Sequence, residues 1–196
     1  LQWPIYLNGV TQLPILQDHL MILIFGKSCP DIQSAMAEYW GLGISNECGP
    51  YDPGEEITLK RVKNNNPNFV QFILKRMVNW GGGTGASIET STKGITYDKR
   101  VQKILRKKDI LKKPHSYQLV QVLNQEIKKI MTTYHEEYNL LTKMPNDVIV
   151  SDKGLTFMCP ECIQYTAQGD ELEVFVPYFR IANYLTNDFK QSINMQ

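Results

Sequence analysis

The stretch SYQLVQVLNQEIKKIMTTYHEEYNLL, residues 116–141, is the most regular part of the chain. Its apolar side chains recur three or four residues apart, which is the period of an amphipathic α-helix. These side chains are Leu119, Leu123, Ile127, Ile130, Tyr134, Tyr138 and Leu141. Ser116 is a suitable N-cap, and Pro114 closes the segment before it. The stretch therefore predicts one long helix with a core-facing stripe.

Helical spacing also dominates the residues before this stretch. The sequence predicts helices over 28–40, over 67–80 and over 98–112, the last with its basic side chains turned outward. Residues 13–25 are so densely apolar that they fit either a buried helix or a loop followed by a buried strand. The glycine-rich and polar residues 81–97 predict a mobile loop or linker.

The period changes after residue 146. Short β-type runs at 148–150, 155–158, 163–166 and 172–176 are separated by turn signals, and a last helix is expected after Pro177. The fold class predicted is α+β, mainly α-helical, with a small antiparallel β meander near the C-terminus. The predicted organisation is an N-terminal helical part (1–80), the loop or linker (81–97) and a C-terminal part (98–196), which can form one domain with 1–80.

The composition is that of an ordinary globular protein. The chain has 196 residues, of which 42% are hydrophobic and 21% are charged, which excludes disordered and collagen-like chains. Four cysteines are too few for a disulfide-stapled scaffold. No apolar run is long enough for a transmembrane helix, and no leader is recognisable, so we expect an intracellular, cytoplasmic protein without a membrane partner. The missing initial methionine suggests a processed product or a piece of something longer, which in a virus could be virion-associated.

Charge is segregated along the chain. Residues 1–60 carry a net charge of −5, residues 61–135 carry +11 and residues 136–196 carry −5. Eight bases lie within 99–113: Lys99, Arg100, Lys103, Arg106, Lys107, Lys108, Lys112 and Lys113. Such a density attracts polyanions over about 8 Å at physiological salt. The segment predicts a phosphate-binding helix for nucleic acid, RNA rather than DNA; the alternatives are a surface neutralised by the acidic flanks and an acidic protein partner.

The cysteines allow a second hypothesis. Cys159 and Cys162 have the two-residue spacing with which two thiolates reach one Zn²⁺. A structural site needs two further ligands, and Cys29, Cys48, His115 and His135 form no second pair of this kind. A zinc-stabilised protein–protein adaptor, a dithiol and a pair of ordinary buried thiols therefore all remain open, and we expect no cofactor unless zinc is present.

Residues 22–31 support a third hypothesis. An apolar run ends in Ser28, Cys29, Pro30 and Asp31 before a predicted helix, which resembles the active-site turn of the glutaredoxin and thioredoxin family. The resemblance implies a thiol-redox module in which the helix dipole lowers the pKa of Cys29. Ile32 stands where the dithiol form of that family has its second cysteine.

The opening residues 3–9 (WPIYLNG), followed by Leu13 and Pro14, resemble proline- and glycine-bearing strands that enter the thumb or C-terminal regions of viral RNA polymerases. Three widely spaced histidines, at 19, 115 and 135, support no catalytic triad and no helical zinc-hydrolase motif. The function we expect is therefore a non-catalytic, nucleic-acid-associated domain or subunit of a larger assembly with other protein subunits. A fragment of a viral RNA polymerase or replication complex is one concrete version of that assembly.

Overall fold

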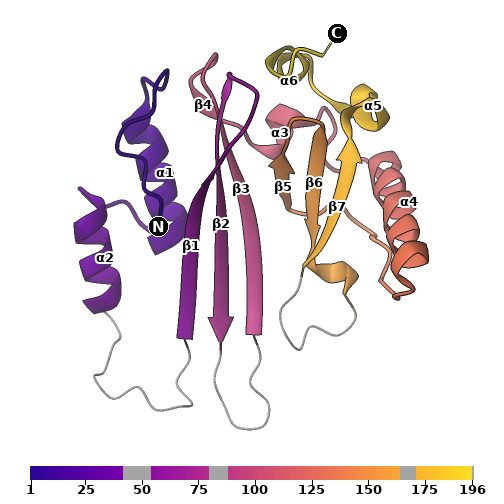
Figure 1. The fold of residues 1–196 in the computed structure, drawn as a ribbon, viewed down its shortest axis with the longest axis horizontal. Coiled ribbons are helices and arrows are strands. Elements are labelled where there is room, and N and C mark those ends of the chain that lie inside the picture. The colour runs from indigo at the N-terminus through magenta and orange to yellow at the C-terminus, as the bar shows by residue number, and fades with distance from the viewer. Residues whose placement is uncertain (42–53, 80–87, 164–170, 196) are drawn as a thin grey trace.

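A computed structural model describes residues 1–41, 54–79, 88–163 and 171–195. Its elements form a row in which two helices, a first sheet, a second sheet and a long helix follow one another (Figure 1). The two sheets have separate hydrophobic cores, one built largely from the N-terminal half and one from the C-terminal half. The chain therefore folds as two halves that meet along a seam between the sheets.

The N-terminal half is a four-stranded antiparallel sheet with one helix packed on a face and a second helix packed against the first. Its elements are α1 (Leu13–Phe25), α2 (Ile32–Gly41), β1 (Gly54–Val62), β2 (Phe69–Asn79), β3 (Ile88–Asp98) and β4 (Lys103–Ile104), with strand order β1-β2-β3-β4. Leu16, Leu20 and Ile24 of α1 pack against Leu59 of β1 and Tyr97 of β3, together with other apolar residues of the strands. The dense apolar run 13–25 is therefore a buried helix, one of the two forms that its pattern allowed.

The C-terminal half is a three-stranded meander backed by the long helix. Its elements are α3 (Lys107–Ile110), α4 (Tyr117–Tyr134), β5 (Asp147–Val150), β6 (Gly154–Cys159), η2 (Pro160–Cys162), β7 (Leu172–Pro177), α5 (Tyr178–Ile181), η3 (Ala182–Tyr184) and α6 (Asn187–Ser192). Leu119, Leu123 and Ile127 of α4 are fully buried in the core that includes Val174 and Val176 of β7. The predicted helix and the predicted antiparallel meander are both present, although α4 ends at Tyr134, where His135 takes a left-handed conformation.

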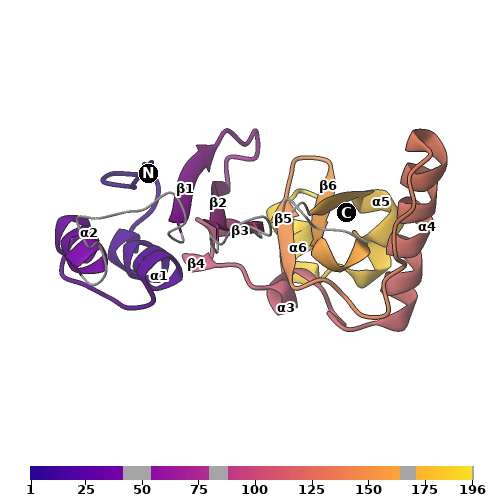
Figure 2. The ribbon, with the colours of Figure 1, turned by 90° about the horizontal axis from the view of Figure 1, so that it is seen from below.

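The seam brings β3 and β5 side by side (Figures 1 and 2). A Cβ atom on Gly94 of β3 would lie 2.9 Å from the Cα of Ile149 in β5, so only glycine allows this approach. The Gln71 side chain donates a hydrogen bond of 2.8 Å to the carbonyl oxygen of Val150. Close backbone contact and a buried amide thus fix the two sheets against one another.

The predicted fold class was wrong in calling the chain mainly α-helical. The expected helix at 67–80 is strand β2, and most of the expected linker at 81–97 is strand β3, while 80–87 lie outside the described residues. β2 misleads because Phe69, Val70, Gln71 and Phe72 are all buried, which hides the two-residue alternation of a strand. β3 misleads because it is rich in threonine and has a glycine that the seam requires. The expected strand at 163–166 lies outside the described residues, except for Ile163.

Candidate functional site: the basic segment between the two halves

The basic segment 99–113 connects the two halves and is not a helix. After β3 the chain turns through Gln102, which has a φ of 52°, forms the two-residue strand β4 and then the single turn of α3. Leu111 forms a bridge with Leu185, which ends the turn. The prediction of a helix over 98–112 was wrong because its apolar residues do not share one buried face. Ile110 and Leu111 are buried in the second core, whereas Val101 is 49% exposed.

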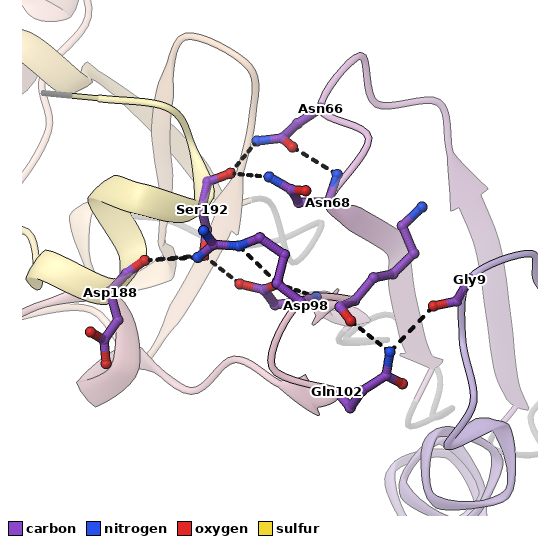
Figure 3. Close-up of polar contacts among 9 residues, drawn as sticks. Gly9, Asn66, Asn68, Asp98, Gln102, Asp188 and Ser192 are labelled. Carbon is purple, nitrogen blue, oxygen red and sulfur yellow. Dashed lines mark hydrogen bonds and ion pairs between the residues drawn. The ribbon is translucent and has the colours of Figure 1, made fainter.

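Lys99 and Arg100 follow Asp98, the last residue of β3, which lies beside Ser192 of α6 at the seam (Figure 3). The Lys99 side chain passes close to Gly9, where an added Cβ would lie 3.2 Å from its Cδ. The Arg100 guanidinium donates to the Ser192 hydroxyl at 2.5 Å and to the Asp188 carbonyl oxygen at 3.3 Å, and it lies 3.8 Å from the Asp98 carboxylate. Of these two bases, both predicted to bind nucleic acid, Arg100 holds α6 against the end of β3, whereas Lys99 packs beside Gly9 within the N-terminal half.

Lys103 and Lys107 are also partly engaged within the fold. The Lys103 ammonium forms an ion pair of 2.9 Å with Asp109. The Lys107 ammonium donates to the Pro145 carbonyl oxygen at 2.7 Å. Burial lowers the pKa of Lys107, against the raising effect of the nearby Asp147 and Glu161 carboxylates. Lys107 therefore serves as an internal contact, whereas Lys103 remains half exposed at a groove described below.

The other four bases are exposed, and we name them together the basic loop: Arg106, Lys108, Lys112 and Lys113. Within the described part of the chain, no side-chain hydrogen bond or ion pair engages these four side chains. The ion pairs that involve the eight predicted bases are made with Asp98 and Asp109, so in the described ranges the acidic flanks do not neutralise the segment by direct pairing. Tyr117, four residues beyond Lys113, is 69% exposed.

A groove of about 400 Å³ runs between α1 and the β4–α3 connection. One wall carries Lys103, Arg106 and Lys108, and the other carries Ile15 and Ile22 of α1. His19 of α1, which is half-buried, also lines the groove. Its pKa is lowered by burial and by the positive charges of Arg106 and Lys93, against the raising effect of Asp18. No sequence motif marks this groove. Its only signal is that residues 13–25 contain more apolar side chains than one core-facing side of a helix needs.

Cys159, at the end of β6, and Cys162, at the end of η2, are buried free thiols. The Cys159 thiol donates a hydrogen bond of 3.5 Å to the Phe157 carbonyl oxygen, and its pKa is raised by a hydrogen bond with Cys162 and by burial. Among the described residues, no three histidine, cysteine or acidic side chains gather as metal ligands would. Within the described ranges the two thiols therefore have no further ligands of the kind that a zinc site requires, and both pack in the second core as small apolar side chains.

Cys29 lies in the connection between α1 and α2. Its thiol is half-buried and lies 3.9 Å from the Glu38 carboxylate, which also pairs with Lys27. The residues before it form helix α1, whereas the resemblance to the thioredoxin family implies a strand there. The strands of both sheets described here are antiparallel, so Cys29 does not sit on the fold that this resemblance implied.

Comparisons with known proteins identify the fold. No protein-family model and no curated protein matches the sequence. A solved structure of a DUF3298 family member from Bacteroides fragilis has a TM-score of 0.70 and 15% identity, covering 91% of this chain and 80% of its own. A DUF3298 family protein from Pseudomonas aeruginosa has a TM-score of 0.62 and 12% identity, covering 90% and 79%. At these identities the likeness shows the fold alone, and that fold is mixed and strand-rich. None of the described helices combines the length and hydropathy needed to cross a bilayer.

Proposed function

We propose that this chain is a non-catalytic binding domain of a larger assembly and that its basic loop holds single-stranded RNA. The observation that supports the proposal is the group of four exposed cations at Arg106, Lys108, Lys112 and Lys113, without side-chain partners in the described part of the chain. An exposed cation that is not neutralised internally can neutralise a phosphate, and each such contact releases counterions.

Tyr117 adds a contact of a different kind. Its ring is 69% exposed and follows the last cation of the basic loop by four residues. An unpaired base stacks on such a ring, and the stacking is worth about 1–3 kcal/mol per base. The combination of backbone cations and an open aromatic ring is typical of surfaces that bind single strands.

The short elements of the segment favour a single strand over duplex DNA. Reading a duplex in the major groove requires a helix or a two-stranded ribbon that enters the groove. α3 has four residues and β4 has two, so the basic segment offers neither. A replication complex or another RNA-handling assembly is the setting that we propose, with protein subunits as further partners.

The test uses charge reversal of the basic loop. Arg106→Glu, Lys108→Glu and Lys112→Glu combined should weaken binding of a fluorescein-labelled single-stranded RNA at least tenfold at low salt and flatten the salt dependence. The matched control reverses Lys60, Lys63 and Lys128, which are exposed elsewhere and change the net charge equally. If the two triple variants lose RNA affinity equally, the net charge of the protein and not the basic loop accounts for binding. Unchanged RNA affinity in the first triple variant would overturn the proposal.

A second pair of variants isolates stacking. Tyr117→Ala should weaken RNA binding about five- to tenfold. Tyr134→Ala is the control, since Tyr134 is 67% exposed on the same helix but lies at its far end. Single-stranded DNA of the same sequence, measured in parallel, tests the preference for RNA.

A further inference from the structure

Helix α1 has more apolar surface than its core contact uses. Leu16, Leu20 and Ile24 are buried against the first sheet, yet Ile15 is 57% exposed and Ile22 is 46% exposed. Ile15 and Ile22 lie seven residues apart, so they belong to one stripe on the helix surface. A helix that is apolar on several sides is normally covered on several sides.

The wall opposite this stripe is basic. Lys103, Arg106 and Lys108 line the same groove, and Gln12 and Gln102 stand among them as neutral polar groups. The acidic members are Asp18 on α1 and Asp109, and Asp109 is held by Lys103 and by the backbone N–H of Arg106. The groove therefore joins an apolar side to a side with an excess of positive charge.

The geometry points to a binding site for a small amphipathic anion in this groove, with a carboxylate or phosphate head against Arg106 and Lys103 and an apolar tail along Ile15 and Ile22. The volume of about 400 Å³ is within the range of small-molecule sites, about 300–1,000 Å³, and is too small for a folded partner. A cationic or a fully polar ligand would leave one of the two walls unsatisfied. This inference stands independently of the proposed RNA contact, although both would use Arg106.

His19 is a reporter built into the site. It lines the groove, and the charged groups that face it are Arg106, Lys93 and Asp18. An anion in the groove would offset the two positive charges, so binding should raise the pKa of His19 and should tighten as the pH falls toward 6. A ligand bound elsewhere would leave the imidazole signals of His19 unchanged.

The experiment compares three probes of equal chain length: decanoate, decyl phosphate and decyltrimethylammonium, each below its micellar concentration. Calorimetry should show saturable binding of the two anions at one site and none of the cation, and the ratio of the two anions identifies the preferred head group. NMR of His19 should show the imidazole signals moving with the anions. Equal binding of all three probes, or anion binding without a change at His19, would overturn the inference.

Variants separate this site from the RNA surface. Ile15→Ser with Ile22→Ser should lower decanoate affinity at least tenfold while leaving RNA binding unchanged. Ile5→Ser is the matched control, since Ile5 is 83% exposed and lies outside this groove. Retained decanoate binding in the double variant would contradict the assigned site. Failure of RNA binding in the wild-type protein would leave the decanoate result standing, so the two proposals fail separately.

Discussion

The Ser192 hydroxyl donates a hydrogen bond to the buried carboxylate of Asp98 and so ties the last helix to the end of β3, 94 residues away in the sequence (Figure 3). The Ser192 carbonyl oxygen accepts hydrogen bonds from the side-chain amides of Asn66, at 2.8 Å, and Asn68, at 2.9 Å. One residue of α6 therefore holds the C-terminal half against two separate segments of the N-terminal half.

Replacing Ser192 by alanine should destabilise the whole fold. The change removes a donor from the buried Asp98 carboxylate and an acceptor from Arg100, and such losses cost about 1–3 kcal/mol. Urea unfolding followed by circular dichroism measures the change. Gln191→Ala, exposed on the same helix, is the control and should stay within about 0.5 kcal/mol.

A methyl group at position 94 should force the two sheets apart. Its Cβ would lie 2.9 Å from the Cα of Ile149 and 2.9 Å from the Val148 carbonyl oxygen, and backbone atoms cannot turn away as side chains can. Gly94→Ala should therefore cost about 1–3 kcal/mol in thermal or urea unfolding. Gly54→Ala has open space around the added atom and serves as the matched strand glycine. A Gly94→Ala variant as stable as wild type would refute the close approach of β3 and β5.

Asn124 should anchor the segment that follows α4. Its buried side-chain amide donates to the Leu141 carbonyl oxygen at 3.0 Å and accepts from the Leu141 backbone N–H at 2.8 Å. Asn124→Leu leaves both backbone groups unpaired, with an expected cost of about 2–4 kcal/mol. Hydrogen exchange at Leu141 should then accelerate more than exchange in β6, and equal acceleration at both places would argue against this anchoring role. The exposed Gln121→Leu change controls for the loss of a polar side chain.

His19 should make the fold less stable in mild acid. Its pKa is lowered in the folded state by burial and by Arg106, so the unfolded chain takes up the proton first as the pH falls through 6.5. The free energy of unfolding therefore decreases below about pH 6.5, because the unfolded state binds more protons. His19→Gln should flatten the stability profile between pH 7 and pH 5 relative to wild type. The matched control is His115→Gln, which replaces an exposed histidine outside the groove.

The cysteines should differ in reactivity. The hydrogen bond with Cys162 and burial raise the pKa of Cys159, so iodoacetamide should modify Cys159 slowly at pH 7. Cys29 is half-buried and should react faster. Mass spectrometry of timed samples gives the order. Fast alkylation of Cys159, or one zinc per chain with a melting temperature that falls on chelation, would contradict the buried-thiol assignment and restore the metal hypothesis.

The sequence determined the elements whose burial is one-sided. In α4 the core residues Leu119, Leu123 and Ile127 recur with the helical period, because one face meets the second sheet and the other meets solvent. In β7 the residues Leu172, Val174 and Val176 are buried and Glu173 and Phe175 are exposed, so the strand shows its period of two. In both elements one face is buried and the other is exposed to solvent, so the spacing of apolar residues shows the secondary structure. The helix and the meander were predicted from this spacing.

Only the tertiary structure decided the elements that are packed on both sides. Phe69 of β2 stacks on Phe189 of α6 with ring centroids 6.1 Å apart, while its neighbour Val70 is buried in the other core. Because both faces of β2 are covered, its apolar residues do not alternate with polar ones, and the sequence of β2 was therefore read as a helix. The tertiary structure also decided which basic side chains are engaged. Arg100 contacts Asp98 of β3 and Asp188 and Ser192 of α6, whereas Lys112 is exposed. The sequence lists the charged residues, but the fold decides which of them are engaged: Arg100 bonds to residues 88 and 92 positions away, and Lys107 to one 38 positions away.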